Sequence, residues 1–178
     1  MPLSPLASKS YPKLQPIAGV RLATASCAVR YAGRTDLLVA ELAEGTKVAG
    51  VLTRSLTASA SVLACIEDLK SGKARGLVVN SGNSNAFTGK AGVASVERIR
   101  EAAGKLFGCG IENIFTSSTG VIGEKLPDEK ITSGLPNREF SEAAWDEAAR
   151  AIMTTDTYPK LATQTAIIEG TKVIINGI

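Results

Sequence analysis

Histidine is absent from all 178 residues of the sequence. A Ser-His-Asp or Cys-His catalytic group therefore cannot be built within this chain, and neither can a zinc site that uses histidine. Aromatic residues make up only 4% of the sequence, which argues against a surface that stacks nucleic-acid bases. If the chain takes part in catalysis, the general base is a group other than imidazole.

Long apolar runs and blocks of like charge are also missing. No apolar run approaches the roughly 20 residues that cross a bilayer, and the start of the chain lacks the apolar core of a signal peptide. The net charge is +3, with lysine and arginine scattered among acidic residues. We therefore expect a cytoplasmic protein that binds neither nucleic acid nor membrane.

Cysteine is scarce as well. Cys27, Cys65 and Cys109 are odd in number, lie far apart and stand among small apolar residues, without CxxC spacing. This pattern favours buried thiols over a metal or redox role. We expect no metal and no cofactor.

Hydrophobic residues make up 44% of the chain, which suits one compact domain. We predict a flexible arm over residues 1–16 and a single α/β domain over residues 17–178. Alternating and helical hydrophobic patterns predict the elements in this order: strands over 20–31, 36–42 and 47–53, a helix over 58–70, a strand over 74–80, a helix over 91–107, a strand over 113–118, a loop containing "EKLPDEK", and a helix over 141–153.

Residues 164–177, "QTAIIEGTKVIING", are expected to form two strands that turn at Glu169-Gly170. An isolated hairpin is marginal in water. We therefore expect the sheet to continue in another chain, or in residues cut from this one.

Two polar loops are candidate sites. In "VVNSGNSNAFTG", Asn80, Gly82, Asn83, Asn85 and Gly89 fit a tight turn from strand to helix, because asparagine and glycine tolerate left-handed backbone angles. A phosphate cradle at the start of the helix is the alternative. Neither GxGxxG nor GxxxxGK[ST] is present to support it.

The second loop, "TSSTGVIGE", follows a predicted strand. It fits a simple turn, or an oxyanion hole in which Thr119 supplies a hydroxyl and Gly120 an unscreened N–H. As an oxyanion hole it would lack a nucleophile. Another chain would have to supply that group.

Three motifs taken together, "VVNSGNSNAFTG", "TSSTGVIGEKLPDEKI" and "IMTTDTYPK", resemble the N-terminal α-chain of the arginine-biosynthesis glutamate N-acetyltransferase family, also called ornithine acetyltransferase. The similarity runs from about Ile17 to Ile178. It implies layered sheets covered by helices, as in N-terminal-nucleophile hydrolases but with the family's own topology. It also implies a sheet completed by a β-chain.

Members of this family are made as one precursor that cuts itself before a threonine. That threonine starts the β-chain, with its hydroxyl as nucleophile and its own amine as base. The resemblance thus implies acetyl transfer from N-acetylornithine to glutamate, with acetyl-CoA as a further candidate donor. It also implies an α2β2 heterotetramer.

Carried over by position, Thr119 and Gly120 match the oxyanion pair, and Thr154 matches a threonine that contacts the amino-acid substrate. The alternative is that Thr154 is an ordinary polar residue at the end of a helix. The chain has Phe87 where the family usually has cysteine, and Ser55 where it has asparagine, so relative substrate preference is left open.

Two other interpretations stay open at this point. One is the α-chain of a related self-processing aminopeptidase with a serine nucleophile. The other is a non-enzymatic α/β module whose glycine-rich loops bind an anion.

Overall fold

A computed structural model describes residues 3–135 and 139–178. Its centre is a four-stranded sheet in the order β1-β2-β3-β4. The first three strands are antiparallel neighbours, whereas β4 runs parallel to β3. The strands span these residues: β1 Val20–Ala25, β2 Leu37–Leu42, β3 Gly76–Asn83 and β4 Ile114–Val121. The C-terminal ends of β3 and β4 therefore lie together at one end of the sheet.

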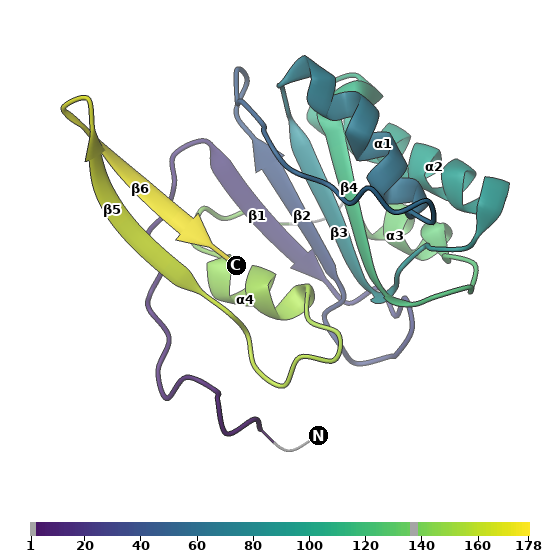
Figure 1. Cartoon of the computed structure of the whole chain (residues 1–178), viewed down its shortest axis with the longest axis horizontal. Coiled ribbons are helices and arrows are strands. Elements are labelled where there is room, and N and C mark those ends of the chain that lie inside the picture. The colour runs from purple at the N-terminus through teal and green to yellow at the C-terminus, as the bar shows by residue number, and fades with distance from the viewer. Residues whose placement is uncertain (1–2, 136–138) are drawn as a thin grey trace.

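Helices cover both faces of this sheet (Figure 1). α2 and α3 pack on one face, α4 packs on the other, and α1 lies along β4 and against α2. The helices span these residues, with two short 3₁₀ turns at Leu69–Ser71 and Ile111–Asn113: α1 Ala60–Asp68, α2 Gly89–Phe107, α3 Asp128–Gly134 and α4 Trp145–Ala151. The expected α/β class is confirmed.

The core follows from alternation along the strands. Val39, Val78 and Ile114 point to the face that α2 covers. Leu38 and Val79, each one residue along, point to the face that α4 covers. Because both faces of the central strands are apolar and covered, β2 and β3 are the most buried elements of the chain.

The strand predicted over residues 47–53 is wrong. Lys47 makes only an isolated bridge to Lys73, and Val51 is 98% exposed. β2 already has β1 and β3 on its two sides, so no edge beside it is open to this apolar segment. Residues 48–59 instead form a connection between β2 and α1.

The segment after "EKLP" is also different from the prediction, because it forms α3 rather than a loop. Asp128 and Glu129 occupy its first turn, where acidic groups stabilise a helix, and Ile131 is fully buried. The short length of α3 hid the helical period of its apolar residues.

Several boundaries and faces also differ. The first strand ends at Ala25 instead of residue 31, and β4 continues to Val121 instead of residue 118. Helical spacing in the sequence predicts an apolar stripe of Val62, Leu63, Ile66 and Leu69 on α1, and this is wrong in part, since Leu63 is 52% and Ile66 is 38% exposed. The residues that this helix buries are Ser61, Cys65 and Asp68.

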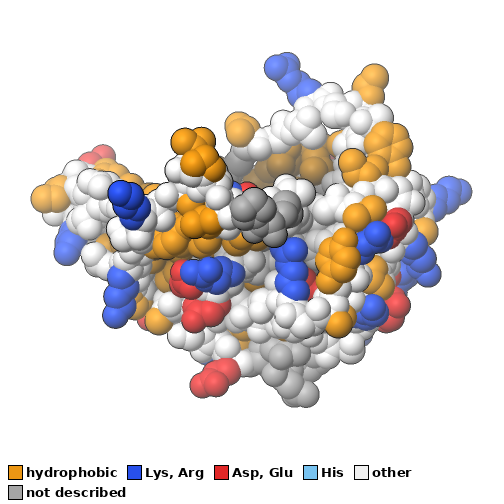
Figure 2. Space-filling view, turned by 90° about the horizontal axis from the view of Figure 1, so that it is seen from below, with side chains coloured by type: hydrophobic (Ala, Val, Ile, Leu, Met, Phe, Trp, Pro, Cys, Tyr) orange, Lys and Arg blue, Asp and Glu red, His pale blue; other side chains and the backbone are white. Residues whose placement is uncertain are grey.

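The C-terminal hairpin forms as predicted. β5 (Ala162–Ile168) pairs with β6 (Thr171–Gly177), and both Glu169 and Gly170 have positive φ in the turn. The hairpin is a separate two-stranded sheet among the described residues, and Ile168 and Ile175 are at least half exposed. Figure 2 shows hydrophobic side chains at the surface over the hairpin, at the left end of that view.

The N-terminal arm, described from residue 3, contains no helix or strand up to residue 16. Leu14 is nevertheless buried, the carbonyl of Gln15 accepts a hydrogen bond from Asn176 at 2.7 Å, and the N–H of Ser4 donates to Thr157. Flexibility of the arm stays a prediction. In residues 3–135 and 139–178, no helix has the length and apolar character that crossing a bilayer requires.

Candidate functional site

Thr119 and Gly120 lie in the last residues of β4, where the pairing with β3 becomes irregular between Gly82 and Asn83, and we call this point the Thr119–Gly120 bend. Gly120 has φ of +134°, and a Cβ built there would lie 2.3 Å from the carbonyl carbon of Gly82 and 2.6 Å from the nitrogen of Asn83. Only glycine fits this close approach of two backbones. A simple turn at these two residues is therefore not what the structure has: Thr119 and Gly120 are paired within β4, and the irregular register brings Gly120 against the Gly82–Asn83 peptide.

The backbone groups of β4 alternate between β3 and the free edge of the sheet. The carbonyl of Thr116 accepts a hydrogen bond from the Cys65 thiol of α1, at 3.3 Å, whereas the carbonyl of Val121 accepts the N–H of Ser84, which follows β3. These two carbonyls point to opposite sides, as alternation over five residues requires. We infer that the N–H of Gly120, four residues after Thr116, turns to the free edge.

The Thr119 side chain is half-buried, and its hydroxyl has no hydrogen-bond partner among the residues that the structure describes. It is thus available to donate to a group outside this chain. Thr119 and Gly120 are thus adjacent potential donors in the edge strand β4. An oxyanion hole needs two donors that can reach one developing charge.

The asparagine-rich loop after β3 forms a tight connection. The Asn83 amide donates to the carbonyls of Glu124 and Lys125, and its oxygen accepts the N–H of Asn85. Asn85 has φ of 49°, is fully buried, and donates to the carbonyl of Gly92 in α2. Because these amides bond within the chain, the loop fits the turn interpretation better than the phosphate cradle.

The end of α4 lies beside the end of β3, because Ser81 donates to the carbonyl of Ala151 at 2.8 Å. Thr154 follows shortly after, half-buried, and its N–H donates to Asp156 at 3.3 Å. The side-chain hydrogen bond from Lys160 lowers the pKa of Asp156 below its ordinary value. Asp156 is therefore ionised at neutral pH and holds the backbone of Thr154.

Thr154 opens into a polar hollow of about 420 Å³. The hollow is lined by Arg34, Thr35, Arg150, Met153, Thr154, Asp156 and Thr157. Thr119 and Gly120 are not among its lining residues. The chain thus gathers the three predicted site residues toward one end of the sheet, but it does not enclose them in one pocket.

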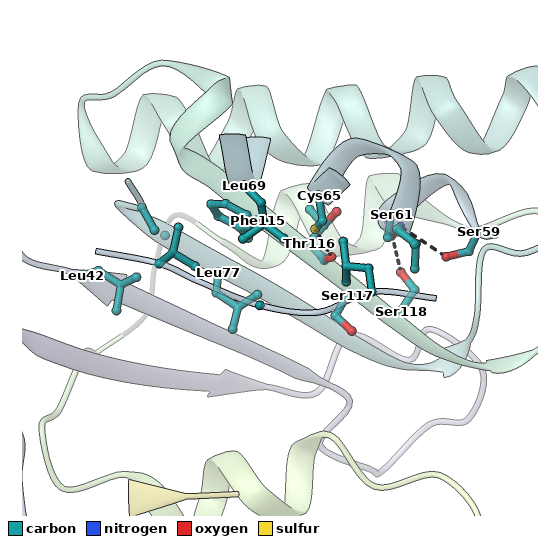
Figure 3. Close-up of a pocket in the computed structure, with 16 residues that line it drawn as sticks. Leu42, Ser59, Ser61, Cys65, Leu69, Leu77, Phe115, Thr116, Ser117 and Ser118 are labelled. Carbon is teal, nitrogen blue, oxygen red and sulfur yellow. Dashed lines mark hydrogen bonds between the residues drawn. The ribbon is translucent and has the colours of Figure 1, made fainter. Parts of the chain in front are cut away.

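A second, apolar groove of about 310 Å³ runs between β4, α1 and the segment after β2 (Figure 3). Leu42, Leu77 and Phe115 form its floor, and Ser117 and Ser118 line its end toward Thr119. Burial raises the pKa of the Cys65 thiol in its wall, so that this thiol is a poor nucleophile at neutral pH. The three cysteines form no disulfide among the described residues.

Sequence reasoning missed two groups in this region. Arg34 was not singled out, although it lines the hollow beside Thr154. Ser61, Asn80 and Ser118 are joined by hydrogen bonds next to the Thr119 bend. The four hydroxyls of "TSST" were a signal for the second group, but the partner residues come from separate elements. Within the described residues, no cluster of three or more acidic or cysteine side chains could hold a metal ion.

Known proteins share this fold. A structure of the arginine biosynthesis bifunctional protein ArgJ from Bacillus halodurans superposes with a TM-score of 0.83 at 29% identity, over 90% of this chain and 85% of that one. An ornithine acetyltransferase from Mycobacterium tuberculosis, complexed with ornithine, gives a TM-score of 0.77 at 32% identity, over 91% and 88%. Residues 21–178 match the ArgJ family. The chain belongs to the ArgJ family.

Curated ArgJ proteins are more similar still. The bifunctional arginine biosynthesis protein ArgJ of Mesorhizobium japonicum is 53% identical over 99% of this chain, and that of Gluconobacter oxydans is 48% identical over the whole of it. The chain spans 43% and 42% of these two relatives. The resemblance to the N-terminal part of the family and the fold that it implied are both confirmed.

Proposed function

We propose that this chain is the α-chain of an acetyltransferase of arginine biosynthesis, which moves the acetyl group of N-acetylornithine to glutamate. Thr119 and Gly120 supply the oxyanion hole, and Thr154 contacts the amino-acid part of the substrate. The nucleophile is the first threonine of a β-chain cut from the same precursor. Acetyl-CoA is a further candidate donor.

The reaction has two half-reactions that share one oxyanion site. The threonine oxygen bonds to the acetyl carbon of N-acetylornithine, the carbonyl electrons move to oxygen, and the C–N bond then breaks as ornithine leaves with the proton. In the second half, the amine of glutamate attacks acetyl-threonine and returns the proton to the threonine oxygen. Thr119 and Gly120 donate hydrogen bonds to the oxyanion in both halves.

The observation that carries the proposal is the pair of donors on an open edge. The Thr119 hydroxyl has no partner in the described chain, and the backbone alternation of β4 turns the N–H of the next residue, Gly120, to the free edge of the sheet. Because no histidine is available, a nucleophile that carries its own amine fits this chain. The ornithine bound in the mycobacterial neighbour adds support for the substrate class.

Chain lengths support the β-chain. This chain covers 43% of a curated relative but 85% and 88% of two solved chains, so in those structures a polypeptide of about this length is a separate chain. The exposed hairpin and the apolar groove along β4 are surfaces that such a partner would cover. An α2β2 assembly in the cytoplasm stays part of the proposal.

Mass analysis of the full-length precursor after purification tests the function directly. We expect a companion chain that begins with threonine and gains the mass of one acetyl group when N-acetylornithine is added without glutamate. Glutamate should then remove that mass. A companion that begins with serine would favour the aminopeptidase, and an uncut chain without acetylation would favour the anion-binding module.

Thr119→Ala tests the oxyanion hole. We expect the matured variant to lose about 10²–10³ in turnover, in both half-reactions and with little change in KM. Thr119→Ser, which keeps the hydroxyl, is the matched control and should retain most of the rate. Single-turnover rates for Thr119→Ala within about twofold of the parent, well short of the loss expected for a missing donor, would place the hole elsewhere.

A further inference from the structure

We propose that Ser118 and Asn80 are positioning residues that hold the Thr119–Gly120 bend in its donating geometry without touching the substrate. The inference rests on the proposed function, because it concerns how the proposed oxyanion donors are held. It assigns a role to a chain of hydrogen bonds that joins α1, β4 and β3.

The direction of the hydrogen bonds in this chain is fixed. Ser118 donates its hydroxyl proton to Asn80 Oδ1 at 2.7 Å, so it can only accept in its 3.3 Å contact with Ser61. Ser61 is therefore the donor in that contact. Figure 3 shows the Ser61 and Ser118 side chains facing each other between α1 and β4. Hydrogen bonds linked head to tail in this way polarise one another and strengthen the chain.

The second half of this chain of hydrogen bonds reaches the backbone of β3 next to Gly120. The amide nitrogen of Asn80 donates to the carbonyl of Asn83 at 2.8 Å. The nitrogen of Asn83 belongs to the peptide that Gly120 packs against, as the 2.6 Å approach of a built Cβ demonstrates. The Asn80 side chain thus fixes both sides of the bend: β4 through Ser118, and the end of β3 through Asn83.

Burial makes this arrangement rigid. Ser61 and Asn80 are each 2% exposed and Asn83 is 3% exposed, whereas Ser118 is half-buried. Loss of the Ser118 hydroxyl would therefore leave the buried oxygen of Asn80 without its donor. Ser118 precedes Thr119 directly along the strand. A shift of its side chain therefore moves the donors themselves.

The same strand offers a contrast. The hydroxyl of Thr116, two residues before Ser118, is buried and has no hydrogen-bond partner in the described chain. A hydroxyl on β4 can therefore be accommodated without a partner. The bonded chain at Ser118 is a specific feature of the end next to the bend, and Thr116 supplies a matched control.

The test compares Ser118→Ala with Thr116→Val in the matured, full-length enzyme. For Ser118→Ala we expect single-turnover acetylation and deacetylation to slow by about 10- to 100-fold, because a small misplacement of donors costs that much. The KM values for N-acetylornithine and glutamate should stay near those of the parent. Thr116→Val should leave both rates and both KM values unchanged.

Two further variants keep the test decisive. Ser118→Thr retains the hydroxyl and should restore most of the rate, whereas Asn80→Asp, which places a carboxylate oxygen against the Asn83 carbonyl, should reproduce the slowing. If Ser118→Ala yields no matured enzyme, Ser61→Ala provides a second variant. Ser61 lies at the other end of the hydrogen-bond chain, and its loss should still slow both half-reactions together. Single-turnover rates do not depend on the fraction of active enzyme.

The outcomes separate the inference from the function. Parent rates in Ser118→Ala and Asn80→Asp, while Thr119→Ala is slow, would overturn the positioning role alone. An equal loss in Ser118→Ala and Thr116→Val would also overturn it, since packing of β4 would then explain both. A parent that never forms acetyl-threonine would overturn the proposed function itself.

Discussion

The β3–β4 end of the sheet and the β5–β6 hairpin are built in opposite ways. At the sheet end, Asn80, Asn83 and Asn85 are almost fully buried and bond within the chain. In the hairpin, Ile168 and Ile175 lie at least half exposed on a two-stranded sheet that no other described strand extends. The buried asparagines of the first region find their hydrogen-bond partners within this chain, whereas the hairpin presents apolar surface that a partner would bury.

The largest effect should come from charging the hairpin. If a companion chain covers Ile175, Ile175→Lys places an ammonium in an apolar contact and should abolish co-purification of the two chains, since burying an unpaired charge costs several kcal/mol. Thr171→Lys, beside the turn at the tip, is the control. Gel filtration and mass analysis measure the result, and an unchanged complex would mean that this face of the hairpin stays in water.

The second largest effect is expected for Gly120→Ala, which disturbs the β3–β4 end of the sheet. A Cβ there meets the Gly82 carbonyl carbon at 2.3 Å on a backbone with φ of +134°, and we expect a loss of about 3 kcal/mol or more in unfolding free energy. Gly177→Ala, in β6 with no atom within 4 Å of the built Cβ, should change little. Urea unfolding of both variants checks this. Equal stability of the two would show that the bend relaxes freely.

Thr154 lies on the connection between the two regions. Thr154→Val keeps the volume and removes the hydroxyl. If Thr154 contacts the substrate as proposed, the lost hydrogen bond should cost about 1–3 kcal/mol, mainly as a higher KM. Thr155→Val, at the exposed neighbouring residue, is the control. Parent kinetics for both donor and acceptor would leave Thr154 as a helix-end residue.

The smallest expected effect is on the way in which the stability of the fold depends on pH. Asp128 at the start of α3 accepts hydrogen bonds from Arg98 at 2.6 Å and Ser95 at 2.8 Å, and the bond from Arg98 is the main cause of its lowered pKa. A lowered carboxyl pKa stabilises the fold above the ordinary value of 3.8, and this stabilisation is lost as the pH falls through the folded-state pKa.

Asp128→Asn should therefore lower the unfolding free energy at neutral pH by about 1 kcal/mol, a modest figure because Arg98 is half exposed. Its stability should also fall less steeply in acid than that of the parent. Melting temperatures from pH 7 down to pH 3 measure both. A variant that loses stability in acid as steeply as the parent would remove Asp128 from the acid transition.

The sequence predicted the elements whose signals are local. The hairpin turn at Glu169-Gly170 and the long helix before Phe107 follow from turn chemistry and helical period. The extra strand at residues 47–53 was wrong because strand propensity carries no information on whether a sheet edge is open. The buried face of α1 was predicted wrongly for a related reason. Asp68 of this helix is buried because it forms an ion pair with Arg100 of α2, and no local sequence pattern indicates such a pair.

The candidate site likewise has one part that local sequence signals predict and another that depends on the folded structure. Thr119 and Gly120 stand out in the sequence because hydroxyls and glycines gather after a strand. The bonds of Ser118 to Asn80 and Ser61 join residues 38 and 57 positions apart. Such contacts depend on the parallel register of β3 and β4, and they emerge only from the folded chain.

The close approach of the β3 backbone to Gly120 limits which substitutions this position can tolerate. Any side chain at that position collides with the backbone of β3, so a library of variants would reject all of them even if the reaction were never assayed. Thr119 carries no such packing demand, because its side chain is half-buried and makes no hydrogen bond within the described chain. Selection for folding and selection for the proposed acetyl transfer should therefore agree at Gly120 and diverge at Thr119.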